Sequence, residues 1–300
     1  MTPAMLRRIA AVLGAALVLW GVVFVWRRGE RDEPGTLRLP PVDTSRVERI
    51  ALRRTTDTIV VTRVSGAWSV NGVPASAEYV AGFLAAYADS SIRTELVAQA
   101  PASHGRLGVD SAAGRRFSME AGGAVVADFV LGNRGPDFEG TYLRSRSDST
   151  VYLLHGRIAD LLLDALDAWR ERRIVAVAPD SIRRVEVAVG RAAWQLVRQD
   201  GGWRAGGAPA DSVKVRRFLA QFEGLRASGF PDPAAEPPRF EAAARVVTLL
   251  ADDGRPLSRL EFVDAGSGAF WVREAGKGTV YRLPAATVDL IAPVRPDLLP

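Results

Sequence analysis

Two short stretches near the start of the chain, residues 47–54 and 58–64, alternate between apolar and polar residues. This period of two is typical of a β-strand with one buried face, because successive side chains of a strand point to opposite sides. A turn that contains Gly66 then leads to a third short strand at Trp68. The pattern predicts a small antiparallel meander. Further strands are expected at residues 115–120, 125–131, 141–145 and 150–154.

After the meander the apolar residues change to a helical spacing. Pro74 and Ser76 are typical of a helix start, and the apolar residues that follow are spaced i, i+3, i+4 and i+7. These residues are Val80, Phe83, Leu84 and Tyr87. A second helix is predicted over residues 157–169, and its apolar stripe consists of Ile158, Leu161, Leu162, Ala165 and Trp169.

The whole pattern occurs twice in the chain. At an offset of 135, Trp68 falls on Trp203 and Pro74 on Pro209, and the match continues without a gap over nearly forty residues. Further on, residues 142–144 and 150–152 match residues 271–273 and 279–281 at an offset of 129. The second copy repeats the helical spacing with Val215, Phe218, Leu219 and Phe222, capped by Asp211 or Ser212, and it ends in a short helix near residues 285–291. The sequence therefore predicts a duplicated domain.

A different apolar pattern precedes the first copy. The uncharged run that begins at Ile9 and ends at Trp26 reaches about 27 Å as a helix, which is enough to cross the hydrocarbon layer of a bilayer. Trp20, Trp26 and two arginine pairs flank it where interfacial anchors belong. We interpret this run as an uncleaved single-span membrane anchor.

Two other interpretations of this run are open. A cleaved signal peptide is disfavoured because the run is long and no small-residue cleavage site follows it. A buried core helix is disfavoured because no polar residue interrupts any face. The positive charges on the two sides nearly balance, and we expect the N-terminus in the cytoplasm and the bulk of the chain in the periplasm or outside the cell.

These patterns predict the fold class and the domain boundaries. We expect an α+β protein in which an N-terminal transmembrane helix precedes two repeated antiparallel-sheet domains, each with about two helices. A cytoplasmic tip and the anchor occupy residues 1–28, and a Pro-rich linker occupies residues 29–44. The first repeat domain is expected at residues 45–177 and the second at residues 178–300. The predicted location is the bacterial inner membrane, as a single-pass protein.

Charge and composition narrow the chemistry. The formal net charge of the 300 residues is +5 and is spread along the chain, whereas a nucleic-acid-binding protein concentrates basic residues on one face. We therefore expect no nucleic-acid partner. The absence of cysteine from the sequence excludes disulfides, thiolate zinc sites, iron–sulfur clusters and cysteine nucleophiles.

Several short motifs carry a resemblance to a known family. They are a W-x-V-x-x-x-P strand and turn before the Phe-Leu helix, then LGVD (107–110), VLGNRGPDFEGTYLR (130–144), STVYLL (149–154) and WRERRIV (169–175). With these motifs the chain resembles the bacterial domain-of-unknown-function 4340 family over most of residues 45–300. The resemblance implies tandem copies behind one membrane span and an accessory role beside ABC-type export systems, including those tied to gliding motility.

The resemblance supplies no catalytic residues. The second copy departs from the motif pattern, because it lacks LGVD and has a Pro-rich segment at residues 231–240 instead. A function that depends on LGVD is therefore expected in the first copy alone.

Few residues suggest catalysis. The two histidines, His104 and His155, occupy non-equivalent places, and a triad of Ser103, His155 and Asp160 lacks a nucleophile-elbow motif. Two scattered histidines also make a poor zinc site. The carboxylates offer no readable pairing for acid–base chemistry: Glu95, Asp110, Asp128 and Asp137. We predict no catalytic, cofactor-binding or metal-binding residue and no cofactor.

Three other features have a structural and a functional interpretation. The loop at residues 132–140, with Asp137 and Glu139, could hold a cation or a phosphate, but a hairpin connection is favoured. Trp68, Trp194 and Trp203 could stack on a ligand, but core packing is favoured. An arginine cluster is interpreted as a solvated helix end and alternatively as a partner contact: Arg170, Arg172 and Arg173.

The function predicted from these features is a membrane-anchored extracytoplasmic scaffold or accessory subunit. It would act through protein–protein contacts with membrane-complex proteins, such as the subunits of an ABC-type export or gliding-like complex, and it is not predicted to be an enzyme. An alternative is a module that binds envelope polymer or lipid in the crevice between the repeats. A further alternative is an enzyme with a scattered site that combines His155 with carboxylates.

Overall fold

The computed structural model describes residues 37–54, 57–232 and 236–299. The predicted anchor from Ile9 to Trp26 lies outside these residues, as does the first half of the predicted linker. Among the described helices, none has both the length and the apolar character that a bilayer span requires. The described chain forms two compact units. The first comprises the described residues up to Gly72 and Ala77–Leu166, and the second comprises Val73–Ser76 and the described residues from Asp167 on.

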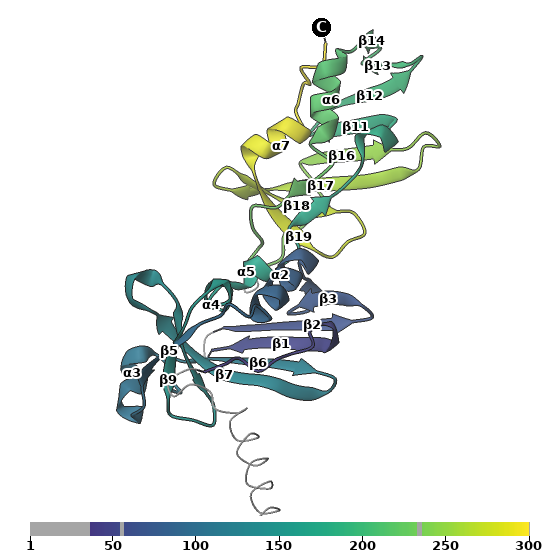
Figure 1. Cartoon of the computed structure of the whole chain (residues 1–300). Helices are drawn as coiled ribbons and strands as arrows, with labels where there is room; N and C mark the ends of the chain where they lie inside the picture. The colour runs from purple at the N-terminus through teal and green to yellow at the C-terminus, as the bar shows by residue number, and fades with distance from the viewer. Residues whose placement is uncertain (1–36, 55–56, 233–235, 300) are drawn as a thin grey trace, which may run out of the picture. The chain divides into compact units, whose positions relative to one another are not determined.

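The first unit contains all strands but β4 of a nine-stranded antiparallel sheet with the order β4-β3-β2-β1-β6-β7-β8-β9-β5 (Figure 1). The strands are β1 (Val47–Arg53), β2 (Thr58–Val64), β3 (Ala67–Val70), β4 (Val73–Pro74), β5 (Thr94–Ala98), β6 (Arg115–Ala121), β7 (Ala124–Arg134), β8 (Thr141–Ser145) and β9 (Val151–Leu154). Its helices are α2 (Ala77–Tyr87), α3 (His104–Leu107) and α4 (Arg157–Leu161). Three short 3₁₀ turns accompany them: η1 (Thr44–Arg46), η2 (Pro101–Ser103) and η3 (Pro136–Phe138).

Helix α2 packs on the inner face of this sheet. Val80, Phe83, Leu84 and Tyr87 are all buried, which confirms the predicted apolar stripe. The ring of Phe117 on β6 lies 6.1 Å from the ring of Phe83 and 6.2 Å from that of Tyr87, and it stacks on Phe129 of β7. Burial raises the pKa of the Tyr87 hydroxyl. The core of the first unit therefore lies between α2 and the inner face of its sheet.

The second unit has an eight-stranded antiparallel sheet in the order β14-β13-β12-β11-β16-β17-β18-β19. The strands are β11 (Arg184–Val189), β12 (Ala192–Gln199), β13 (Gly202–Ala205), β14 (Ala208–Pro209), β16 (Arg245–Leu250), β17 (Pro256–Gly266), β18 (Ala269–Glu274) and β19 (Val280–Pro284). The remaining elements are α5 (Leu166–Trp169), β10 (Arg173–Val175), η4 (Pro179–Ser181), α6 (Ser212–Ala220), β15 (Leu225–Arg226) and α7 (Ala285–Ile291).

The core of the second unit lies beneath α6 and α7. Val215, Phe218, Leu219 and Phe222 are buried there, as the repeated pattern predicts, together with Val288 and Ile291 of α7. Asp211 is the N-cap of α6, because its carboxylate accepts hydrogen bonds from the backbone N–H groups of Val213 and Lys214. This settles the choice that the sequence left open between Asp211 and Ser212.

The fold is therefore α+β with two large antiparallel sheets and a few short helices. Eight strands follow the same order in both sheets, from β4 to β9 and from β14 to β19. The strand that follows the first long helix of each unit is placed differently. Strand β5 pairs with β9, whereas β15 pairs with β10 in a separate two-stranded sheet.

One predicted helix is interrupted. Residues 157–169 were expected to form a single helix, but the structure divides them into α4 and α5. Arg115 approaches the carbonyls of Leu162 and Asp164 in the break, each at 3.5 Å, and forms an ion pair with Asp57. A guanidinium that satisfies carbonyls at the end of α4 stabilises the end of the helix at this point.

Candidate functional site

The outer face of the first sheet carries a row of arginines. The register pairs Arg53 of β1 with Arg116 of β6, Arg116 with Val130 of β7, and Val130 with Arg144 of β8. Directly paired residues share a face, and neighbouring strands are about 4.8 Å apart. Three arginines and one valine therefore form one row across four strands, and we call this set the arginine row.

Only part of this positive charge is neutralised by neighbouring carboxylates. Arg116 donates to Asp128 from Nε and Nη2, both at 2.9 Å, and Arg146 reaches the same carboxylate at 3.6 Å. The bidentate hydrogen bonds raise the pKa of Arg116, so its charge is fixed. Within the described part of the chain, Arg53 and Arg144 form no ion pair with a carboxylate.

The LGVD segment forms a wall beside the arginine row. Leu107 and Val109 are buried against Val130 and Val151 in a small apolar cluster on this outer side of the sheet. The segment approaches so closely that a Cβ atom on Gly132 of β7 would collide with the carbonyl of Leu107. A glycine is therefore required at this point of β7.

Polar contacts fix the same wall. Arg144 donates from Nε to the carbonyl of Val109 at 2.9 Å. The carboxylate of Asp110 accepts from the backbone N–H groups of Ala112 and Ala113, at 3.1 and 2.7 Å. Between the wall and the arginine row lies a cavity of about 320 Å³, lined by Arg53, Arg54, Asp110, Ser111, Gly114, Arg116, Val130, Arg144 and Arg146.

The same positions of the second sheet carry different side chains. The register pairs Ala188 with Val246, Val246 with Glu261, and Glu261 with Arg273. Ala188 and Val246 thus stand where Arg53 and Arg116 stand in the first unit. Glu261 accepts a hydrogen bond from Arg273 at 2.8 Å, so the single arginine that this row retains is neutralised.

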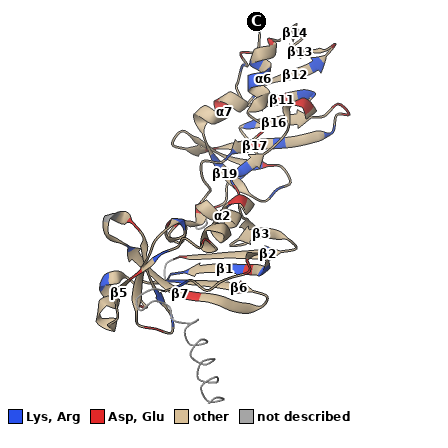
Figure 2. Cartoon of the chain, in the orientation of Figure 1, with Lys and Arg blue, Asp and Glu red and all other residues tan. Residues whose placement is uncertain are grey.

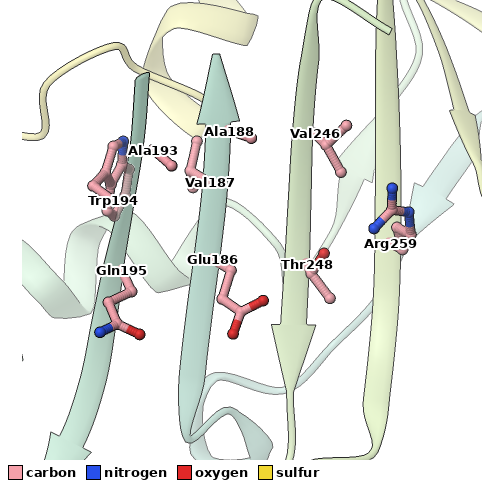
Figure 3. Close-up of a pocket in the computed structure, with 9 residues that line it drawn as sticks. All are labelled: Glu186, Val187, Ala188, Ala193, Trp194, Gln195, Val246, Thr248 and Arg259. Carbon is pink, nitrogen blue, oxygen red and sulfur yellow. The ribbon is translucent and has the colours of Figure 1, made fainter. Parts of the chain in front are cut away.

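A hollow of about 520 Å³ lies on the second sheet. Figure 3 shows its lining residues on four neighbouring strands. The register pairs Gln195 with Glu186, Glu186 with Thr248, and Thr248 with Arg259. Trp194 also lines it, and its indole N–H donates to the carbonyl of Pro293 at 2.8 Å while its ring packs on Phe218. Figure 2 shows basic and acidic residues distributed along both units. Five arginines nevertheless line the cavity beside the arginine row, so this excess of positive charge is local.

The histidines lie in separate contacts. His155 Nε2 is 3.3 Å from the carboxylate of Glu95, and His104 Nε2 is 2.7 Å from the carbonyl of Ser149. The carboxylate of Asp160 is bound by Arg134 at 2.7 Å, and Ser103 lies in η2. Within the described residues, no group of three or more histidines and carboxylates is arranged to hold a metal ion.

The loop at residues 132–140 joins the paired strands β7 and β8, so the hairpin interpretation is confirmed. Asp137 lies in its turn η3, and Glu139 follows that turn. Phe138 at the tip is 80% exposed and has a φ of 62°, a left-handed conformation that bulky residues rarely adopt. The loop thus presents an aromatic side chain to solvent.

The structure also bears on the interpretation of the tryptophans and of the arginine cluster at residues 170–173. Trp68 pairs with Arg63 and Trp203 with Arg198 at equivalent registers, and both indoles are half-buried. Trp194 and Trp203 pack against the hydrophobic core of the second unit, as the sequence interpretation favoured. The expectation that Arg170 is solvated is wrong. Its side chain is 13% exposed, and its guanidinium stacks on the ring of Phe230 at 4.5 Å. Burial of the aliphatic stem and the ring contact stabilise it there.

Two arginines, one in each unit, make equivalent contacts that the sequence analysis did not predict. Arg245 of β16 donates to the carbonyl of Ala292, which follows α7, at 2.9 Å, and it pairs with Asp289 at 2.7 Å. Arg115 occupies the same register position of β6 and approaches the carbonyls that follow α4. The signal was present as an arginine at the start of the same strand in each copy.

The arginine row has no local sequence signal, because its members are far apart in the chain and meet only through strand pairing. Arg144 was already part of the repeat match, and a comparison of the two copies along β1 and β6 would have shown two arginines replaced by Ala188 and Val246. Two of the carboxylates singled out in the sequence belong to this region. Asp128 neutralises Arg116, and Asp110 accepts a backbone hydrogen bond at the end of the LGVD segment.

Comparison with known proteins gives one match. The sequence profile of a domain of unknown function (DUF4340) matches residues 68–245, from the Trp68 strand of the first unit to the start of β16 in the second. No curated protein and no solved structure matches the chain. Because the profile covers more than half of the sequence, the chain belongs to the DUF4340 family.

Proposed function

We propose that this chain is a membrane-anchored scaffold or accessory subunit of a membrane complex, acting through protein–protein contacts. The apolar run from Ile9 to Trp26 would hold it in the bacterial inner membrane as a single-pass protein. The two sheet units, which we propose arose by duplication, would lie on the periplasmic or extracellular side. The identical order of eight strands in the two sheets supports duplication.

The observation that carries the protein-contact proposal is Phe138. Arg134 holds its backbone by donating to the Phe138 carbonyl at 3.2 Å, and Asp160 holds the Arg134 side chain at 2.7 Å. A left-handed conformation at a bulky residue costs about 1–3 kcal/mol. An aromatic side chain that is presented at such a cost is typical of an interface anchor.

The partner proposed is a subunit of an ABC-type export or gliding-like complex, which is the association that the family resemblance implies. In this proposal the chain is not an enzyme, has no catalytic, cofactor or metal residue, and takes no nucleic-acid partner. Binding of envelope polymer or lipid between the repeats stays a prediction, because no observation within either unit bears on it.

The experiment is affinity purification of the full chain from detergent-solubilised membranes, with the permease and ATPase subunits of the exporter quantified. We expect Phe138→Ser to lower their recovery by tenfold or more, since an anchor residue contributes about 2 kcal/mol. The matched control is Val125→Ser at the other end of β7, where Val125 is 58% exposed. The proposal fails if the wild-type chain recovers no exporter subunit, or if both variants recover as much as the wild type.

Membrane topology has a separate test. Protease added to spheroplasts should degrade both units while the N-terminal tip stays protected. Protection of the two units would place the bulk of the chain in the cytoplasm and contradict the proposed orientation.

A further inference from the structure

The cavity beside the arginine row has a large excess of positive charge. Five guanidinium groups line it, from Arg53, Arg54, Arg116, Arg144 and Arg146. The adjacent carboxylates are those of Asp110, which is turned to backbone N–H groups, and Asp128, which two arginines share. Asp57, the next carboxylate along the chain from Arg54, is bound by Arg115. The net charge of the five arginines, Asp110 and Asp128 is therefore +3.

Like charges on directly paired strand positions destabilise a sheet. Arg53 and Arg116 are such a pair, and Arg144 stands one strand beyond Val130. The second unit avoids this repulsion with Ala188, Val246 and Glu261. The first unit keeps its charges together, which is favourable when an anion occupies the cavity.

Two of the five guanidinium groups are also held in place by hydrogen bonds. Arg116 is fixed by its two hydrogen bonds to Asp128, and Arg144 by the carbonyls of Val109, Ser145 and Asp148. Arg53 and Arg54 are exposed and form no ion pair within the described ranges. Two fixed and two unneutralised guanidinium groups around a cavity form a preorganised anion site.

We propose that this cavity binds a phosphate group. An arginine fork matches the oxygens of phosphate, and an excess charge of +3 favours a dianion over a single carboxylate. A volume of about 320 Å³ is at the lower end of small-molecule sites, which suits one phosphate with a small attached group. The phosphate can belong to a soluble phosphoester or to a phospholipid headgroup, and both present the same chemistry.

The inference goes beyond the scaffold proposal, because the site is separate from Phe138 and needs no exporter subunit. It also gives a role to LGVD, which forms the wall of the cavity and is absent from the second copy. The binding site is therefore expected in the first unit alone.

The test is isothermal titration of the full chain in nonionic detergent at fixed ionic strength. One arm uses inorganic phosphate, and the other uses mixed micelles with short-chain phosphatidic acid, with phosphatidylcholine micelles as the reference. Arg53→Gln/Arg54→Gln is expected to weaken binding by about tenfold, since two charge-assisted contacts are lost. Both residues are exposed and Arg53 faces the like charge of Arg116, so the melting temperature should not fall.

The matched control is Arg191→Gln/Arg216→Gln, which removes the same charge from exposed positions of the second unit. It should retain wild-type affinity. Binding in the inorganic phosphate arm identifies a soluble phosphoester, and binding of phosphatidic acid alone identifies a headgroup. The inference is overturned if neither probe binds the wild type, or if the control loses as much affinity as the Arg53/Arg54 variant. Exporter recovery is unaffected by either result, so this test and that of the scaffold proposal fail independently.

Discussion

The outer faces of the two sheets carry different side chains, while the inner faces share one pattern. On the inner face, Phe117 and Phe129 of the first unit and Val247 and Leu260 of the second are all buried beneath helices. On the outer face, Glu261 stands in place of Val130 and Val263 in place of Gly132. The inner positions must fill a core, whereas the outer positions are free to acquire a charge pattern and a covering segment.

The wall explains the difference at Gly132. In the first unit the LGVD backbone lies directly over this residue, so no side chain fits. In the second unit the segment before β16 instead places Phe240 against the guanidinium of Arg273, at 4.4 Å. Arg144 and Arg273, which occupy the same register position of β8 and β18, thus hold different segments by different interactions.

The largest expected effect tests what the two units share. Arg115→Met removes a side chain that is 5% exposed and frees Asp57 and two carbonyls, so we expect a loss of about 3 kcal/mol. Arg245→Met should cost about 2 kcal/mol, because its partner Asp289 is more exposed. Hydrogen exchange read by mass spectrometry assigns each loss to a unit. An unchanged exchange rate in either variant would break the equivalence of the two arginines.

The next effect tests the wall. Gly132→Ala inserts a methyl group against the Leu107 carbonyl and should destabilise the first unit by about 1–3 kcal/mol in urea unfolding. Gly82→Ala in α2 is the control, because the nearest atom to the added Cβ is on the Arg157 side chain of α4, 3.6 Å away. In a helix, alanine is also more favourable than glycine by about 1 kcal/mol. A tolerated Gly132→Ala would show that LGVD does not lie over β7.

The neutralised row of the second unit gives a smaller effect. Glu261→Gln keeps the shape of the side chain but removes the charge that binds Arg273, and Glu261 is 13% exposed. We expect the second unit to lose about 1 kcal/mol in urea unfolding. Equal stability of Glu261→Gln and wild type would mean that neutralisation is unimportant in the second unit.

The smallest effect concerns the cap of α6. Backbone hydrogen bonds from Lys214 and Val213 hold the pKa of Asp211 below its usual range. Because the folded pKa is lowered, this contribution is present above the unfolded pKa of about 3.9 and is lost as the pH falls through the folded value. Asp211→Asn should keep the cap but lose that pH dependence, whereas Asp211→Ala loses the cap. Melting temperatures at pH 3 and pH 6 measure both, and identical pH profiles for the Asp211→Asn variant and the wild-type chain would contradict the expectation.

The sequence predicted the features that depend on local spacing. The strands β1 and β2 and the apolar stripe of α2 follow from neighbours along the chain. The burial of β1 does not alternate as predicted, because Ile50, Ala51 and Leu52 are all buried. These signals are strong because a core position cannot become polar without a large cost. The hairpin at residues 132–140 followed from the same reasoning.

The candidate site could not be predicted in the same way. The arginine row depends on which residues stand opposite one another in four strands, and β-bulges shift the register between Val47 and Arg49 and between Leu131 and Arg134. A shift of one residue would move an arginine to the other face. The split of residues 157–169 depended on Arg115, some forty residues earlier. Long-range contacts of this kind have no signature in a local pattern.

The segment Val73–Ser76 belongs by its contacts to the second unit, where the Ser76 N–H donates to the Trp169 carbonyl at 2.8 Å and the Glu171 N–H donates to the Pro74 carbonyl at 3.0 Å. All the other parts of the second unit leave the ribosome more than ninety residues later. During synthesis this four-residue segment therefore lacks two of its backbone hydrogen bonds until Trp169 and Glu171 emerge. A second unit expressed as a fragment that starts after this segment would lack these two backbone hydrogen bonds. A single cut in the chain therefore does not yield the complete second unit.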